Sequence, residues 1–114
     1  MKRGEVWLVN LEPVVGSEVG KRRPAVVIQN DLANRRSPTV TLVPLTSKTE
    51  RVFPFQVLIA AGEGGLPHQS KALCEQVRTV SRQRLERCLG RLSSERMGEI
   101  RLALDRHLWF DPPA

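Results

Sequence analysis

A short charged loop early in the chain carries the side chains best suited to chemistry on a phosphate. Residues 16–24, G-S-E-V-G-K-R-R-P, hold four charged side chains: Glu18, Lys21, Arg22 and Arg23. Pro24 fixes the backbone directly after Arg23, and the β-branched run that follows gives this arginine a rigid support. A guanidinium presents a planar, bidentate fork to phosphate oxygens and stays charged. The loop therefore predicts a firmly held cation at Arg23, or else a plain surface loop with a weak Glu18–Arg23 ion pair.

The composition indicates one domain with an anionic partner. At 114 residues the chain has room for one hydrophobic core, so we expect a single domain over residues 1–114. It carries 18 lysines and arginines against 12 aspartates and glutamates, a net charge of +6. This balance favours a nucleic acid or an acidic protein as partner, with a merely solubilising basic surface as the alternative.

Several function classes are excluded by what the sequence lacks. Glu5 and Asn10 interrupt the apolar region that a signal peptide would need, and no stretch approaches the roughly 20 apolar residues of a membrane span. We therefore expect a soluble, cytoplasmic protein that does not associate with membranes. Cys74 and Cys88 stand outside any metal-binding spacing and are predicted to be buried thiols, with no disulfide, metal or other cofactor.

Five segments are typical of β-strands: residues 5–11, 24–30, 39–46, 54–59 and 71–80. They are rich in β-branched residues, and the last is long enough to bend. Since Pro44 cannot donate a hydrogen bond, the third strand is expected to meet an edge or a bulge there. The pieces between strands, residues 32–38 among them, are rich in Gly, Pro and charge and are interpreted as loops.

The apolar period changes in the last third of the chain. Residues 81–92 place three leucines at helical spacing, Leu85, Leu89 and Leu92, and predict a helix. A second, amphipathic helix is expected to begin at Ser93 or Ser94, to bury Met97, Ile100, Leu104 and Leu108, and to stop before Pro112 and Pro113. Together these elements predict a mostly β, α+β fold: a small SH3-like barrel or strongly bent antiparallel sheet with a C-terminal helix.

Six short motifs follow one another along the chain: K-R-G-E-V-W at 2–7, G-S-E-x-G-x-x-R-P at 16–24, V-V-I-Q-N-D at 26–31, P-L-T-S at 44–47, E-Q-V-R-T at 75–79 and R-L-E-R at 84–87. Together they cover almost the whole chain. In these motifs and their order the sequence resembles the MazF/PemK family of toxin endoribonucleases. The resemblance implies a homodimer that cuts single-stranded RNA at short sequences without a metal ion and that an acidic, MazE-like antitoxin holds inactive.

The same resemblance assigns roles to individual residues. It implies that Arg23 and Thr46 are the catalytic pair, because they stand in the matching G-x-x-R-P and P-L-T-S contexts. It also places Glu18 at the family's acidic loop position and matches Gln76 and Arg78 to its E-Q-V-R-T segment. Chemistry favours Arg23 as the group that stabilises the phosphorane, because its high pKa makes it a poor proton carrier. Thr46 would hydrogen-bond a phosphate oxygen or orient the 2′-OH.

Proton transfer needs further groups, and the sequence leaves their identity open. Glu18 is the first candidate for the general base, and Glu75 is a weaker one. His68 lies in the loop G-G-L-P-H-Q-S-K, and its ordinary titration near neutral pH would suit acid or base work, with a solvated loop histidine as the alternative. The family does not generally carry a histidine there.

Seven residues are predicted to hold the RNA: Lys21, Arg22, Lys48, Arg51, Phe53, Gln76 and Arg78. The cations would neutralise phosphates without reading sequence, whereas Phe53 would stack on an unpaired base or else pack in the core. Two other functions remain open at this stage. One is a noncatalytic RNA-binding module, and the other is a gyrase poison of the CcdB type, which shares the architecture.

Overall fold

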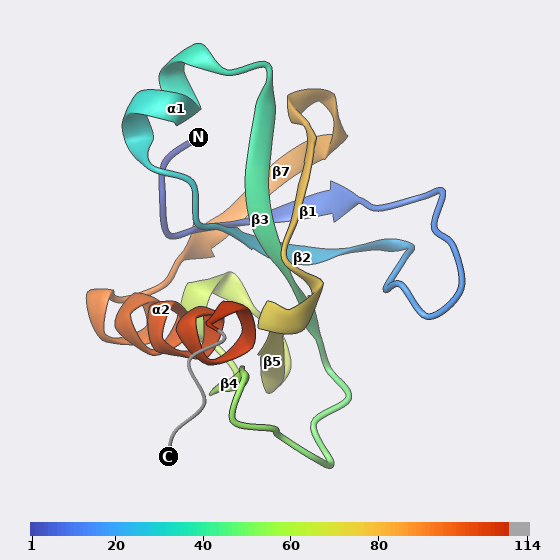
Figure 1. Cartoon of the computed structure of the whole chain (residues 1–114), viewed down its shortest axis with the longest axis vertical. Helices are drawn as coiled ribbons and strands as arrows, with labels where there is room; N and C mark the ends of the chain where they lie inside the picture. The colour runs from blue at the N-terminus through green and yellow to red at the C-terminus, as the bar shows by residue number, and fades with distance from the viewer. Residues whose placement is uncertain (110–114) are drawn as a thin grey trace.

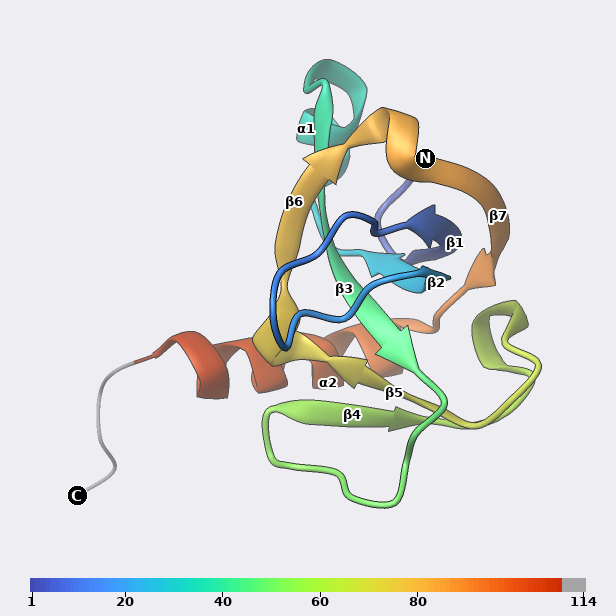
Figure 2. The same ribbon diagram turned by 90° about the vertical axis from the view of Figure 1, so that its right-hand side faces the viewer.

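The computed structural model describes residues 1–109. In this part of the chain seven antiparallel strands form one strongly bent sheet (Figures 1 and 2). The strands are β1 (Glu5–Asn10), β2 (Arg22–Val27), β3 (Thr39–Thr46), β4 (Gln56–Ile59), β5 (Ser70–Leu73), β6 (Arg78–Ser81) and β7 (Leu85–Arg91). Their order is β4-β5-β3-β2-β1-β7, with β6 paired to β3. The sheet does not close, so the bent-sheet form of the prediction is confirmed and the barrel is not.

Helices and short turns connect and cover the strands. The helices are α1 (Asp31–Arg36) and α2 (Ser94–Leu108), and the 3₁₀ turns are η1 (Glu63–Gly65), η2 (Cys74–Gln76) and η3 (Arg82–Arg84). Helix α2 begins after Ser93, whose hydroxyl accepts a hydrogen bond from the Arg96 amide at 3.1 Å, as an N-cap does. It ends at Leu108, and the predicted stop at Pro112 and Pro113 lies outside the described residues. No helix in residues 1–109 is both long and apolar enough to cross a bilayer.

Strand β3 is the centre of the sheet and changes partner along one edge. From Thr39 to Leu42 it pairs with β6, and at Leu45 and Thr46 it pairs with β5. Pro44 falls between the part of β3 that pairs with β6 and the part that pairs with β5. The other edge of β3 pairs with β2. A residue without an amide hydrogen is tolerated at such a break. This position accounts for the irregularity expected at Pro44.

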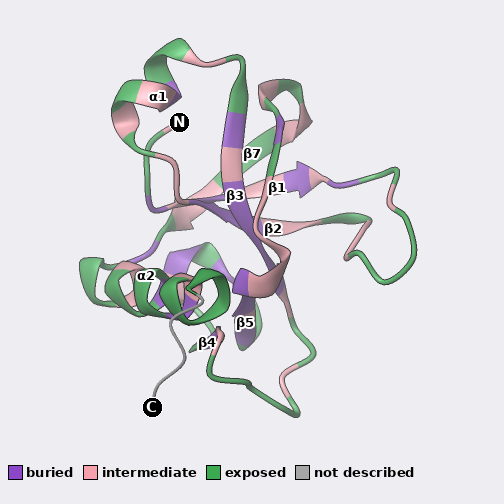
Figure 3. Ribbon diagram, viewed as in Figure 1, coloured by how far each residue is buried: buried purple, intermediate pink, exposed green. Residues whose placement is uncertain are grey.

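Two apolar clusters lie on opposite faces of the bent sheet. One packs Val26 and Val43 against Ile100 of α2, and the other gathers Val27 and Leu42 with neighbouring strands. Adjacent strand residues enter different clusters because side chains alternate across a pleated strand. Figure 3 shows the buried residues along β2 and β3 and the exposed outer face of α2. Leu108, expected in the apolar face of the helix, is 55% exposed.

Three sequence-based predictions of elements are wrong. Residues 81–92 form η3 and strand β7 instead of a helix, residues 71–80 form two strands separated by η2, and residues 31–36 form α1 instead of a loop. Helix α1 has its own cap, because the Asn30 side chain accepts a hydrogen bond from the Ala33 amide at 2.9 Å. The turn η2 lets the chain pass from β5 to β6 along the same edge of β3.

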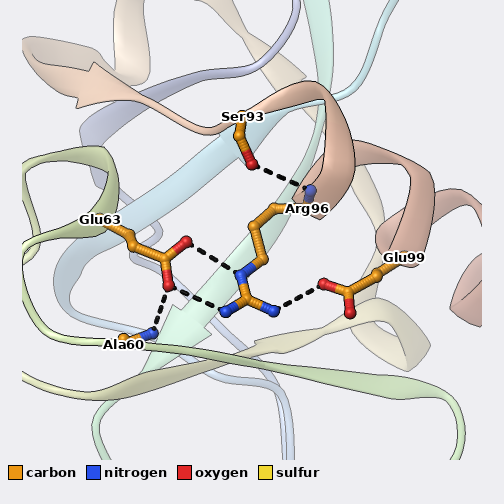
Figure 4. A network of polar contacts seen from close by, with 5 residues as sticks. All are labelled: Ala60, Glu63, Ser93, Arg96 and Glu99. Atoms are coloured by element: carbon orange, nitrogen blue, oxygen red, sulfur yellow. Dashed lines mark hydrogen bonds and ion pairs between the residues drawn. The ribbon is translucent and has the colours of Figure 1, made fainter.

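A polar network ties the loop after β4 to the start of α2 (Figure 4). The Arg96 guanidinium contacts the Glu63 carboxylate through Nε at 2.9 Å and Nη2 at 3.0 Å, and contacts Glu99 through Nη1 at 2.8 Å. Glu63 also accepts from the Ala60 amide at 3.0 Å. These bonds hold one end of the 60–70 loop, and the other end of this loop enters β5.

The two cysteines differ in exposure. Cys74 is buried, as predicted, but Cys88 is exposed, so the prediction of a second buried thiol is wrong. Burial raises the pKa of the Cys74 thiol to about 12, and the nearby Glu75 charge acts in the same direction. Cys88 lies in β7, the strand at the outer edge of the sheet.

Candidate active site

Arg23 and Thr46 line the same pocket, which has a volume of about 300 Å³. Strands β2 and β3 bring them there: the antiparallel register pairs Ala25 with Pro44, and continuing it by two residues sets Arg23 across from Thr46. Because side chains repeat every second residue along a strand, both are carried to the same face. The pocket's polar lining consists of Arg22, Arg23, Thr46, Ser47, Lys48, His68 and Ser70.

The Arg23 guanidinium is oriented by backbone carbonyls. Its Nε donates to the Gly20 oxygen at 2.7 Å, and its Nη1 donates to the Leu45 oxygen at 3.4 Å. Partial burial lowers the pKa of Arg23, although an arginine remains a cation at neutral pH. Since a guanidinium has five N–H donors, these two bonds leave others for an anion in the pocket. The arrangement presents a fixed positive charge, as stabilisation of a phosphorane requires.

Thr46 is half-buried at the end of β3 with its hydroxyl available as a donor. Its Oγ1 accepts a hydrogen bond from the Lys48 amide at 3.2 Å. This bond uses a lone pair of the oxygen and leaves the hydroxyl proton free to point elsewhere. Thr46 and Arg23 therefore offer two donors to one bound group.

Glu18, predicted as the base, does not line this pocket. Its exposed carboxylate accepts from the Val15 amide at 2.5 Å and borders a second pocket of about 340 Å³, together with Gln76 and Arg78. The Gln76 side chain accepts from the Val19 amide at 2.7 Å and so holds the β1–β2 loop beside η2, as Figure 2 shows. The predicted site residues thus fall into two groups, Arg23 with Thr46 and Glu18 with Gln76 and Arg78.

Glu75 borders the same second pocket from a more buried position. Its Oε2 accepts from Gln56 Nε2 at 2.7 Å. Its Oε1 is buried without a hydrogen-bond partner among the described residues. No group of three or more His, Cys, Asp or Glu side chains in residues 1–109 is placed to hold a metal ion.

Comparisons with known proteins identify the family. Residues 2–108 match the model of the PemK-like, MazF-like toxins of type II toxin-antitoxin systems. The chain belongs to this family. It is 43% identical over 113 residues to the endoribonuclease MazF9 of Mycobacterium tuberculosis, covering 95% of this chain and 96% of that protein. The match confirms the resemblance seen in the sequence and does not favour a CcdB-type gyrase poison.

Solved structures of MazF proteins share the fold. A crystal structure of MazF from Deinococcus radiodurans has a TM-score of 0.84 at 26% identity, with 96% of this chain and 97% of that chain covered. A crystal structure of MazE–MazF from the same organism has a TM-score of 0.76 at 27% identity, with 95% of both chains covered. The bent sheet with one C-terminal helix is therefore the fold of MazF toxins.

Three further predicted RNA contacts of this MazF-like chain are cations that differ in position and partners. Arg22 lines the first pocket, but its Nε is 3.0 Å from the Glu86 carboxylate, so part of its charge is compensated. Lys48 is exposed on the first pocket. Lys21 is exposed in the β1–β2 loop, in a left-handed conformation (φ 66°). Neither Lys48 nor Lys21 forms an ion pair with a carboxylate of the described residues. Of these two lysines, Lys48 is the one that lines the pocket of Thr46.

An aromatic pair lies beyond the pockets, in the β3–β4 loop of the toxin fold. The Phe53 ring stacks on Phe55 with centroids 5.3 Å apart and planes 4° apart, and the Arg51 guanidinium lies 5.6 Å from the Phe53 ring. Phe53 is 40% exposed, so one part of its surface remains accessible. Neither Phe53 nor Arg51 lines the two pockets described above.

His68, a candidate for acid or base work, is an exposed residue of the loop before β5. It lines the first pocket together with Arg23 and Thr46. The loop that carries it has no regular periodicity, so its approach to β2 and β3 could not be read from the sequence. A histidine in a Gly- and Pro-rich loop was the only available signal.

Proposed function

We propose that the chain is a single-domain endoribonuclease toxin that cleaves single-stranded RNA without a metal ion. The observation that carries the proposal is the placement of Arg23 and Thr46 in one pocket of a MazF-type fold. The relative from Mycobacterium tuberculosis, 43% identical, is an endoribonuclease by name.

The chemistry is a transesterification within the RNA strand. The 2′-OH attacks the adjacent phosphorus, the O2′–P bond forms and the P–O5′ bond breaks, which leaves a 2′,3′-cyclic phosphate and a 5′-OH. Arg23 stabilises the charge that develops on the nonbridging oxygens. Thr46 donates to one of these oxygens or orients the attacking hydroxyl. DNA lacks the nucleophile and is not cut.

Glu18 stays a prediction as the base that receives the 2′-OH proton. Since it borders the second pocket, this role requires the RNA to cross from one pocket to the other. Gln76 and Arg78 would then contact a neighbouring nucleotide beside Glu18. An RNA strand that occupied both pockets would contact Arg23 and Thr46 in the first pocket. It would contact Glu18, Gln76 and Arg78 in the second.

The exposed cations and the aromatic pair would bind the RNA outside the scissile bond. Lys21, Arg22, Lys48 and Arg51 would neutralise phosphates, and Phe53 would stack on a base. Stacking is compatible with many bases, so short-sequence preference would come from edge contacts in the pockets.

An acidic antitoxin of the MazE type is the proposed protein partner, and the toxin is proposed to act as a cytoplasmic homodimer that inhibits translation by cutting mRNA. Support comes from the solved MazE–MazF complex of Deinococcus radiodurans. The net charge of +6 also favours an acidic chain. Such a chain would compete with RNA for the cations around residues 16–23.

The test is a cleavage assay in EDTA with a long single-stranded RNA and an all-DNA copy. Cuts at a recurring short motif, with 2′,3′-cyclic phosphate and 5′-OH ends, are expected from the unmodified protein and not from Arg23→Ala. Arg36→Ala is the matched control, because this exposed arginine lies on α1 away from both pockets. RNA binding without cleavage by the unmodified protein would instead establish a noncatalytic binding module.

A further inference from the structure

The loop that carries His68 holds its backbone in place although the side chain is exposed. Leu66, two residues earlier, is buried in the core cluster beneath α2, and Pro67 restricts the backbone between them. Ser70, two residues later, is buried at the start of β5, and its Oγ donates to the His68 carbonyl at 3.0 Å. The backbone of His68 is therefore anchored on both sides, and the residue lies at the wall of the Arg23–Thr46 pocket.

The rest of the pocket is poorly equipped to move protons. Its charged side chains are Arg22, Arg23 and Lys48, and no aspartate or glutamate of residues 1–109 lines it. Arginine and lysine hold their protons far above neutral pH, and hydroxyl groups hold theirs as well. The two carboxylates considered as bases, Glu18 and Glu75, border the other pocket. Histidine is the side chain that ordinarily both gives and accepts a proton near neutrality.

We propose that His68 is the general acid of the cleavage reaction, an inference that rests on the function proposed above. As the P–O5′ bond breaks, the imidazolium N–H gives its proton to O5′, so the leaving group departs as a neutral 5′-OH. The proton of the attacking 2′-OH passes to Glu18 or to water. The neutral imidazole then recovers a proton from solvent, and the enzyme is ready for another cycle.

The decisive test compares two substrates that differ only in the leaving atom. One is a short RNA with the normal 5′-oxygen at the cleavage site, and the other carries sulfur in place of that oxygen. A thiolate leaves without protonation, so the second substrate does not need a general acid. His68→Ala should lose about 10²-fold or more in kcat on the oxygen substrate and remain close to the unmodified enzyme on the sulfur substrate.

Gln69→Ala is the matched control, because Gln69 is the exposed neighbour in the same loop and does not line the pocket. It should behave like the unmodified protein on both substrates. Added imidazole should restore part of the activity of His68→Ala, whereas it should not restore Arg23→Ala. Thermal unfolding of each variant shows whether the fold is retained.

Two results would overturn the assignment of His68. Full activity of His68→Ala on the oxygen substrate would show that the imidazole is not needed. An equal loss on both substrates would show that His68 binds or positions the RNA instead of protonating O5′. Both results leave the proposed function intact, which would fail only if the unmodified protein did not cut the oxygen substrate.

Discussion

At the scale of single residues, the Arg23 side chain is oriented before any substrate arrives. Its bonds to the carbonyls of Gly20 and Leu45 connect the β1–β2 loop with the end of β3. A preorganised charge stabilises a transition state without first having to reorganise. A lysine at position 23 would lack the planar fork that makes these two bonds and still presents further donors to a phosphate.

The Thr46 hydroxyl permits a sharp test of its role. Thr46→Val removes the hydroxyl while keeping the β-branched shape, and we expect it to lose about 10²–10³-fold in kcat, as the removal of one donor to a developing oxyanion does. Thr46→Ser keeps the donor and should retain most of the activity. Steady-state kinetics on a short RNA separates the two variants. Equal activity of Thr46→Val and the unmodified enzyme would assign Thr46 to packing.

The two thiols should differ in reactivity toward iodoacetamide. The folded protein should be alkylated at Cys88 and not at Cys74, because Cys74 is buried and its pKa is raised to about 12. In denaturant both should react. Mass spectrometry counts the added groups, and Cys88→Ser should remove the labelling of the folded protein. Rapid labelling of folded Cys74 would show that the core around η2 opens readily.

The residue types of the candidate site could be predicted, but their grouping could not. Arg23 and Thr46 stand in motifs that the sequence displays, whereas their placement in one pocket depends on the β2–β3 register. In that register Ala25 pairs with Pro44, which lies 19 residues later in the chain, and no local sequence pattern encodes such a pairing. Glu18 is closer to Arg23 in sequence than Thr46 is, yet it borders the other pocket.

At the scale of elements, β7 shows why an apolar period can mislead. Leu85 and Leu89 are four residues apart, a spacing that suits one helix face and also one face of a strand. In the structure Leu85 packs with one core cluster and Leu89 with the other, because two register shifts interrupt the β1–β7 ladder. The β-branched run over residues 39–46, by contrast, forms strand β3 with the predicted bounds. Bulges depend on the partner strand and escape a single-sequence prediction.

The Glu63–Arg96 contact should make the stability of the η1–α2 junction depend on acid. Hydrogen bonds from Arg96 and from the Ala60 amide lower the pKa of Glu63 below its ordinary value near 4.5. A carboxyl with a lowered folded-state pKa stabilises the fold above its unfolded pKa and loses this effect as the pH falls through the folded value. Glu63→Gln should therefore lower the unfolding temperature at pH 7, with the difference shrinking below about pH 4.5.

Thermal unfolding between pH 3 and 7 measures this difference. Glu50→Gln is the control, because Glu50 is exposed and has no ion pair within the described residues. Its unfolding temperature should follow that of the unmodified protein at each pH. A Glu63→Gln difference that stayed constant down to pH 3 would show that the carboxylate charge contributes nothing to the junction.

At the scale of the whole molecule, the excess of positive charge should make the affinity for RNA fall as the salt concentration rises. Each phosphate that a cation neutralises contributes about 0.7 to the slope of log affinity against log salt for single strands. Lys48→Ala should reduce the slope by about 0.7 for a non-cleavable RNA with 2′-deoxyribose at the scissile position, whereas Arg36→Ala should not change it. Fluorescence anisotropy at several salt concentrations gives both slopes. An unchanged slope for Lys48→Ala would place Lys48 outside the RNA path.

The pairing of β1 with β7 also has a consequence for the time at which the molecule can finish folding. Strand β1 is synthesised first among the strands, and its outer edge stays uncovered until β7, the last strand, has been synthesised. At ordinary rates of translation this interval is on the order of ten seconds. Strands β2 and β3 and the His68 loop emerge in the meantime beside an open edge. A chain interrupted before β7 should therefore give an aggregating fragment and not a smaller active nuclease, because an uncovered strand edge recruits other chains.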